Sequence, residues 1–181
     1  MKPITIYLIL FLFLQQAAGQ SDNIPPTGPQ YLNHIYYYIR ADSINELEQN
    51  AARMVSKGSG GEFVMDGARS TIRIKTGDSV RFLVKTTMTM MDPSMMIRLY
   101  KFIPNKGERV ATASSQGYAN NGKGSKDETV ISYNTLKIAD GFILVPASPL
   151  APGEYGFLNI MMMSGAGTRH MSYSIFAFGV D

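Results

Sequence analysis

Apolar and polar residues alternate with a period of two along most of the chain from residue 68 onward, a pattern typical of half-buried β-strands. Residues 71–75 (TIRIK) alternate apolar with charged side chains, and residues 79–85 (SVRFLVK) resume the strand pattern after the turn residues 76–78. Because tight turns join antiparallel neighbours, we expect these two segments to pair as a hairpin.

Two more hairpins are predicted further along the chain. Residues 95–103 lead through a Pro-Asn-Lys-Gly turn into the strand pattern of residues 108–113. Residues 136–139 and 142–145 flank an Asp140-Gly141 pair. An Asp-Gly pair between apolar runs is the strongest short-range hairpin signal, because both turn residues need a positive φ.

Three more strands are expected, two near the end of the sequence and one before residue 68. Residues 153–163 and 171–180 supply the last two strands, and the aromatic and branched residues 31–40 (YLNHIYYYIR) supply a first one. The stretch between this first strand and Gly61 is ambiguous. Ser43 to Glu46 fits a capping box and good helix formers follow, so we predict one short helix near residues 44–57.

Eight or nine short strands at this spacing predict an all-β protein. We expect a single antiparallel β-sandwich domain over residues 31–181, immunoglobulin-like or jelly-roll-like. An outer-membrane barrel is the alternative, because its lumen could hold the charged side chains that lie opposite the apolar face. Such a barrel has strands of about 10 residues and aromatic girdles. The strands here are shorter and show no girdle pattern, so we favour the sandwich.

The first 19 residues have the three parts of a secretory signal peptide. Lys2 supplies the positive charge, residues 4–14 form an apolar core, and small residues precede a cut between Gly19 and Gln20. A transmembrane helix needs about 20 apolar residues, and no later stretch is long enough. Residues 20–30 form a Pro-containing spacer. We therefore expect an extracytoplasmic protein, periplasmic or secreted, with no transmembrane segment after cleavage.

Composition excludes several classes of protein. The 181 residues include 17 Lys+Arg and 14 Asp+Glu, which is not the strongly basic profile of a nucleic-acid-binding protein. The absence of Cys excludes disulfides, thiolate zinc sites, iron–sulfur clusters and cysteine nucleophiles. No Gly-rich loop joins a strand to a helix, so nucleotide binding has no support. We expect no cofactor.

Methionine is the unusual feature of the composition, with clusters at residues 88–96 and 161–163. Thioether and imidazole ligands suit Cu(I), so a periplasmic Cu(I)-binding protein is one alternative function. Methionine also fills core gaps and adaptable surfaces, and consecutive residues of a strand face opposite ways, so residues 161–163 cannot all reach one metal ion. The candidate Cu(I) ligands are Met88, Met90, Met95, Met161, Met163, His170 and Met171.

The chain shows no convergent catalytic set, and we predict no catalytic residue. His34 and His170 are the only imidazoles, and no nucleophile elbow accompanies either one, although a hydrolase using one of them is a further alternative. Asp92, Asp140 and Glu154 each lie beside Pro or Gly at a strand end, where we expect turn or edge roles.

Two other segments have features of binding sites. Residues 118–128 resemble a calcium loop, but they lack the alternating acidic positions and a terminal Glu at the offset that such loops require. Tyr36 and Tyr38 share one face of a strand and could form a small platform for a carbohydrate. Aromatic residues of half-buried strands are more often part of the core, which is the role we expect here.

Several short segments carry a resemblance to a known group of proteins. The most specific is residues 150–157 (LAPGEYGF), followed by Phe178-Gly179 near the end of the sequence. The others are Ile35-Tyr36-Tyr37, Gly67 to Ser70, Asp92-Pro93 before residues 97–99, and Asp140-Gly141 opening a segment that ends in Val145-Pro146. In these segments the chain resembles an uncharacterised family of small secreted β-sandwich proteins of the Gram-negative bacterial envelope. The resemblance implies the fold and the compartment, and it implies no activity, cofactor or site residue.

These observations predict a non-enzymatic secreted or envelope protein. We expect it to act by binding, or by structural interaction with, an unknown envelope protein or surface component, and not with nucleic acid. Cu(I) binding through the methionine clusters is the first alternative. A carbohydrate-binding module or a hydrolase is the second.

Overall fold

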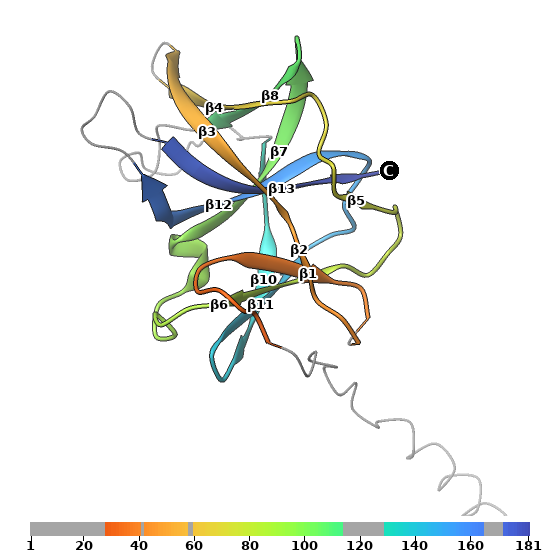
Figure 1. Cartoon of the computed structure of the whole chain (residues 1–181), viewed down its shortest axis with the longest axis vertical. Coiled ribbons are helices and arrows are strands. Elements are labelled where there is room, and N and C mark those ends of the chain that lie inside the picture. Colours follow the sequence, from red (N-terminus) through yellow and green to blue (C-terminus); the bar gives the residue numbers. More distant parts are fainter. Residues whose placement is uncertain (1–27, 41, 58–59, 114–128, 165–171) are drawn as a thin grey trace, which may run out of the picture.

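The computed structural model describes residues 28–40, 42–57, 60–113, 129–164 and 172–181 (Figure 1). Within these ranges the chain forms thirteen strands and one short 3-10 helix, η1 (Pro93–Met95), so the prediction of an all-β protein is confirmed. No helix in the described part of the chain is long and apolar enough to span a membrane. The predicted signal peptide lies outside the described residues.

The strands fall into two sheets. The bounds are β1 (Ile35–Tyr38), β2 (Asn45–Glu46), β3 (Glu48–Lys57), β4 (Gly60–Asp66), β5 (Arg73–Ile74), β6 (Arg81–Lys85), β7 (Ile97–Asn105), β8 (Glu108–Ala113), β9 (Val130–Ile131), β10 (Tyr133–Ile138), β11 (Gly141–Pro146), β12 (Gly153–Ser164) and β13 (Ser172–Val180). Sheet A has the order β10-β11-β6-β1-β2, and the other sheet contains the remaining eight strands.

Six strands of the second sheet close into a barrel. They follow the order β12-β13-β3-β4-β8-β7, and β7 pairs again with β12, always antiparallel. Two short strands lie outside this ring: β9 pairs with β7, and β5 pairs with β13. Closure into a barrel differs from the immunoglobulin-like or jelly-roll-like sandwich that we predicted, because the pairing of β7 with β12 leaves no open edge between them.

The barrel is filled by side chains that point inward from all six strands. Residues paired across neighbouring strands share a face, so the register identifies this set. It consists of Ala52, Phe63, Met65, Tyr100, Phe102, Ala111, Leu158, Ile175 and Ala177. The barrel interior is therefore a packed core.

A second and larger core lies between the barrel and sheet A. Alternate residues of β12 and β13, such as Phe157 and Phe178, face away from the barrel interior and pack against Phe82 of sheet A, at ring centroid distances of 4.7 and 4.9 Å. Figure 1 shows sheet A in the lower part of the view, beneath the barrel strands. Sheet A thus covers one side of the barrel wall.

The short helix predicted near residues 44–57 is wrong, because this stretch forms β2 and β3. β3 pairs with β13 on one side and with β4 on the other, so its backbone groups form ladder hydrogen bonds along both edges. Its alternate residues Glu48 and Ala52 pair with inward-facing positions of neighbouring strands. Pairing with β4 and with the distant β13 outweighs the modest helix propensity of the local sequence.

Two of the three predicted hairpins are present, but residues 71–75 and 79–85 do not pair. β5 runs parallel to β13 in the barrel sheet, with Arg73 opposite Gly179, whereas β6 lies in the middle of sheet A. The chain crosses between the two sheets at the turn that contains Gly77, where φ is +92°. Period-two alternation identified both strands and could not identify their partners.

The Asp140-Gly141 hairpin forms with a different turn from the one predicted. Gly141 already belongs to β11 and pairs with both Ile138 and Lys85, without a positive φ. Glycine is needed there because a Cβ atom would lie 1.9 Å from the carbonyl oxygen of Val84. The two-residue turn with positive φ at both positions is Lys106-Gly107, between β7 and β8.

Candidate functional site

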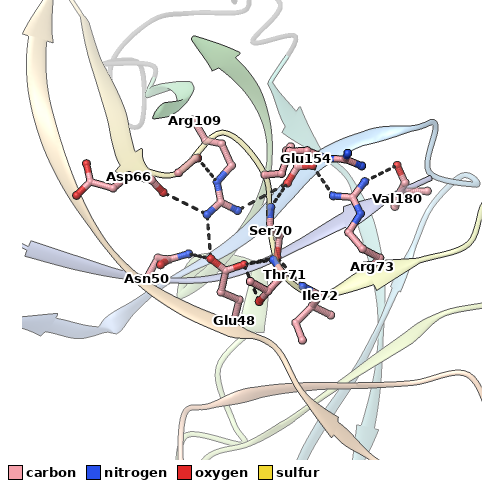
Figure 2. A network of polar contacts seen from close by, with 12 residues as sticks. Glu48, Asn50, Asp66, Ser70, Thr71, Ile72, Arg73, Arg109, Glu154 and Val180 are labelled. Atoms are coloured by element: carbon pink, nitrogen blue, oxygen red, sulfur yellow. Dashed lines mark hydrogen bonds and ion pairs between the residues drawn. The ribbon is translucent and has the colours of Figure 1, made fainter. Parts of the chain in front are cut away.

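A buried network of charged side chains occupies one end of the barrel (Figure 2). Arg109 of β8 pairs with Met65, Glu48 of β3 with Ala177, and Glu154 of β12 with Phe102. Because cross-strand partners share a face, these three charged side chains enter the barrel from three different strands. The network therefore sits where the apolar filling of the barrel ends.

Arg109 is the centre of the network and is completely buried. Its Nε donates to the carbonyl oxygen of Gly67 at 2.9 Å, and its Nη2 donates to Oε1 of Glu48 at 3.0 Å and to the carbonyl oxygen of Asp66 at 3.3 Å. Its Nη1 lies 3.7 Å from Oε2 of Glu154, an ion pair without a hydrogen bond. A guanidinium can be kept inside a protein only with partners of this kind.

Glu154 connects Arg109 to the segment after β4 and to β5. Its Oε2 accepts from the backbone N–H of Ser70 at 2.8 Å, and its Oε1 accepts from Nη1 of Arg73 at 2.5 Å. Arg73 also donates to the carboxylate of Asp181, which holds the pKa of that exposed carboxyl below its ordinary value. Glu154, for which we predicted a turn or edge role, is instead buried.

Glu48 accepts hydrogen bonds at both carboxylate oxygens. Ser70 Oγ and Thr71 N–H donate to Oε2 at 2.5 and 2.7 Å, and Asn50 donates to Oε1 beside Arg109. Burial acts to raise the pKa of Glu48, but these hydrogen bonds outweigh burial and lower the pKa to about 2. Glu48 is therefore a fixed anion at neutral pH.

The chemistry of this network is structural rather than catalytic. Both oxygens of Glu48 and both oxygens of Glu154 are engaged by protein groups, so neither carboxylate is free to move a proton to or from a substrate. Among the described residues, no group of three or more His, Cys, Asp or Glu side chains could hold a metal ion. The network closes the end of the barrel.

Sequence reasoning missed this network for a simple reason. Its members lie in segments that are far apart in the chain. Alternation also does not determine whether each charged side chain faces the barrel interior or the solvent. Arg109 in the pattern ERVATA is a possible signal, because it shares its strand parity with Ala111 and Ala113. That parity alone does not name the partner carboxylates.

The predicted Cu(I) ligands divide into those the structure describes and those it does not. Met88, Met90 and Met95 lie in the connection between β6 and β7, with 38%, 97% and 57% of their surfaces exposed, and Met91 beside them is 42% exposed. Met96 is buried in the core between the barrel and sheet A.

The second methionine cluster lies on the strand that pairs with β7. Met161 and Met163 are on β12, and Asn159 of β12 pairs with Ile97, the first residue of β7. The antiparallel register therefore places the end of β12 and the start of β7 at the same end of the sheet. The side chains of Met161 and Met163 lie outside the described residues, as do His170 and Met171 altogether.

The remaining sequence candidates have packing or turn roles in the structure. Tyr36 and Tyr38 are buried, which confirms the expected core role and leaves no carbohydrate platform there. Asp92 caps η1 by accepting from the N–H of Ser94 at 2.9 Å. His34 packs between the rings of Tyr31 and Phe176, each at a centroid distance of 5.3 Å. The calcium-like loop at residues 118–128 lies outside the described residues.

Comparison with known proteins finds no family model, no curated protein and no solved structure that matches the chain. The resemblance to secreted envelope proteins therefore stays a prediction from the sequence.

Removal of the central guanidinium is expected to destabilise the fold strongly. Arg109→Met leaves Glu48 without a guanidinium partner and leaves the buried Glu154 with Arg73 alone, and breaking buried pairs of this kind costs about 3–5 kcal/mol of unfolding free energy. Arg53→Met is the matched control, because Arg53 is exposed and solvent screens its ion pairs with Glu108 and Asp66, so a much smaller loss is expected. Urea denaturation measures both. Equal losses in the two variants would contradict the role assigned to Arg109.

Stability is expected to fall in acid through Glu48. Its pKa is about 2 in the folded chain and near its ordinary value of 4.5 when unfolded. A lowered pKa stabilises the fold fully above pH 4.5, and this contribution of about 3 kcal/mol is lost as the pH falls toward 2. Urea denaturation at several pH values should show this loss in the wild type and a shallower one in Glu48→Gln. Identical slopes for the two proteins contradict the prediction.

Proposed function

We propose that this chain is a non-enzymatic, extracytoplasmic binding protein that contacts a partner protein through the exposed methionine side chains between β6 and β7. We refer to Met88, Met90, Met91 and Met95 as the methionine loop. The observation that carries the proposal is the exposure of all four side chains within eight consecutive residues. Clustered exposed apolar groups are typical of interaction sites, and flexible thioethers adapt to varied apolar surfaces.

The loop has a defined backbone that presents these side chains. Met88 N–H donates to Thr86 Oγ1 at 3.2 Å, and Met91 N–H donates to the carbonyl oxygen of Met88 at 3.3 Å. Met95 N–H donates to the carbonyl oxygen of Asp92 at 3.0 Å within the η1 turn. Local hydrogen bonds of this kind limit the entropy lost when a partner binds.

The extracytoplasmic location is part of the proposal and rests on residues 1–19, whose sequence has the parts of a signal peptide. We also propose that the two layers formed by sheet A and the barrel wall facing it are a variant of the β-sandwich architecture. The large core shared by the two layers supports this description. An envelope protein or surface component with an apolar groove is the partner we expect.

Photocrosslinking tests the methionine loop as a contact surface. A photoreactive residue at position 90 should give a specific crosslinked product in the native envelope, and one at position 54 on β3 should not, although Met54 is also 47% exposed. Excess wild-type chain should compete, whereas a variant with all four loop methionines changed to Gln should compete at least about tenfold more weakly, because burial of each side chain is worth over 1 kcal/mol. Equal competition by the two chains contradicts the proposal.

Cu(I) binding is a second candidate function of the same loop. Four thioethers lie within eight residues, and the register of β12 with β7 brings the segment containing Met161 and Met163 to the same end of the sheet. Thioethers are soft ligands that select Cu(I). Competition with a Cu(I) chelator should show one bound ion that is lost in the four-Gln variant and kept in Met54→Gln. Failure of the wild type to compete removes this candidate and leaves protein binding.

A further inference from the structure

The strand β10 forms an open edge of sheet A. In the described part of the chain it pairs only with β11, and its four central residues, 134–137, are all exposed. Native proteins keep edge strands short or block them with proline or charge, because an open edge pairs with another strand. The opposite edge of sheet A, β2, has only two residues. β10 has six residues, no proline and a single charged side chain, Lys137, so it is open to a further strand.

The hydrogen bonds to β11 determine which backbone groups of β10 point outward. Ala147 N–H donates to the carbonyl oxygen of Ser132 at 3.0 Å, which makes these two residues a hydrogen-bonded pair at the start of the ladder. Bonded and non-bonded pairs alternate along an antiparallel ladder, so the next pair, Tyr133 with Pro146, is non-bonded, as suits a proline without an N–H. By the same alternation, backbone N–H and C=O groups point away from β11 at Tyr133, Thr135 and Lys137.

We propose that β10 pairs antiparallel with β10 of a second copy of this chain, with Thr135 of one copy opposite Thr135 of the other. The outward groups are symmetric about Thr135, so this register lets all three residues of each copy pair. Thr135 then pairs with Thr135, and Tyr133 pairs with Lys137 of the other copy, in about six backbone hydrogen bonds. The two copies of sheet A become one continuous sheet with a two-fold axis at Thr135.

The exposed leucine on β10 favours a second copy as the partner. Leu136 pairs with Ile143, and both side chains lie on the face of sheet A that is turned away from the barrel. Leu136 is 38% exposed there. In the proposed register the two copies of Leu136 are diagonal neighbours across the two-fold axis, within reach of long side chains. Each leucine then covers the other.

The polar side chains on the opposite face also fit a second copy. Thr135 faces Thr135 across the axis, which is a favourable cross-strand pair. Lys137 faces the neutral Tyr133 of the other copy. The two Lys137 residues are about 14 Å apart, since four strand positions separate them, and charges at that distance are screened at physiological salt. The one charged residue of the edge therefore does not oppose self-pairing in this register.

Association in solution tests the proposal. Sedimentation equilibrium of the purified chain should show reversible dimers that predominate at about 100 µM, because an edge-to-edge interface is small. Thr135→Pro removes the outward N–H at the two-fold axis and leaves the bonded pairs with β11 unchanged, so the dimer should weaken at least about tenfold. Thr135→Val is the matched control, because it keeps the N–H and should keep the dimer. Unfolding midpoints establish that both variants fold.

Single cysteines test the register by a separate measurement. The chain has no Cys, so each substitution introduces one thiol. Opposing Cα atoms of a hydrogen-bonded pair are about 5.5 Å apart, within the range of a disulfide. Thr135→Cys should therefore give a covalent dimer under mild oxidation by diamide. Lys137→Cys is the control on the same strand, and its two thiols are too far apart to join within the dimer.

Dimerisation that is lost in Thr135→Pro, kept in Thr135→Val and trapped by Thr135→Cys upholds the proposal. A chain that stays monomeric at about 100 µM overturns it, and then a strand of another protein is the remaining partner for this edge. A dimer unaffected by Thr135→Pro, or equal disulfide yields at positions 135 and 137, also overturns it. The variant with four Gln in the methionine loop should still dimerise, so this inference and the proposed function can fail separately.

Discussion

A guanidinium buried inside the barrel is the constraint on which the rest of this structure depends. Arg109 cannot be desolvated alone, so its position requires two carboxylates and two backbone carbonyls brought from elsewhere in the chain. Glu154 is in turn a buried anion and Glu48 a partly buried one, and both form ion pairs with Arg109. Arg109 therefore links three strands that are distant in sequence at one end of the barrel.

The network also explains features outside the barrel wall. Arg73 bridges Glu154 and Asp181, and so ties β5 to the last residues of the sequence. Gly179 leaves the space that the Arg73 guanidinium fills, because a Cβ there would lie 1.6 Å from Nη1. The backbone of β5 adds a parallel pairing with β13 at the same place. The absence of a hairpin between β5 and β6 follows from this attachment.

The barrel has a packed interior and a polar network at one end, so the binding that we propose involves the periphery. The methionine loop lies in the connection between two strands, where its side chains are exposed. Met96 beside the loop is buried in the core between the barrel and sheet A. A rigid core with adaptable margins is a common division of roles in binding proteins.

Strand parity and turn chemistry were enough to predict an all-β chain, most strand positions, two of the hairpins and the core roles of Tyr36 and Tyr38. These features follow from local rules, since the alternation of apolar and polar residues and the turns formed by Gly or Pro involve only a few consecutive residues. The strand identity of β3, the closure of β7 onto β12 and the meeting of Arg109, Glu48 and Glu154 were decided only by tertiary structure. Each depends on which distant strand becomes a neighbour. Alternation of apolar and polar residues cannot specify that neighbour, because the backbone of any strand offers the same pattern of hydrogen-bond donors and acceptors.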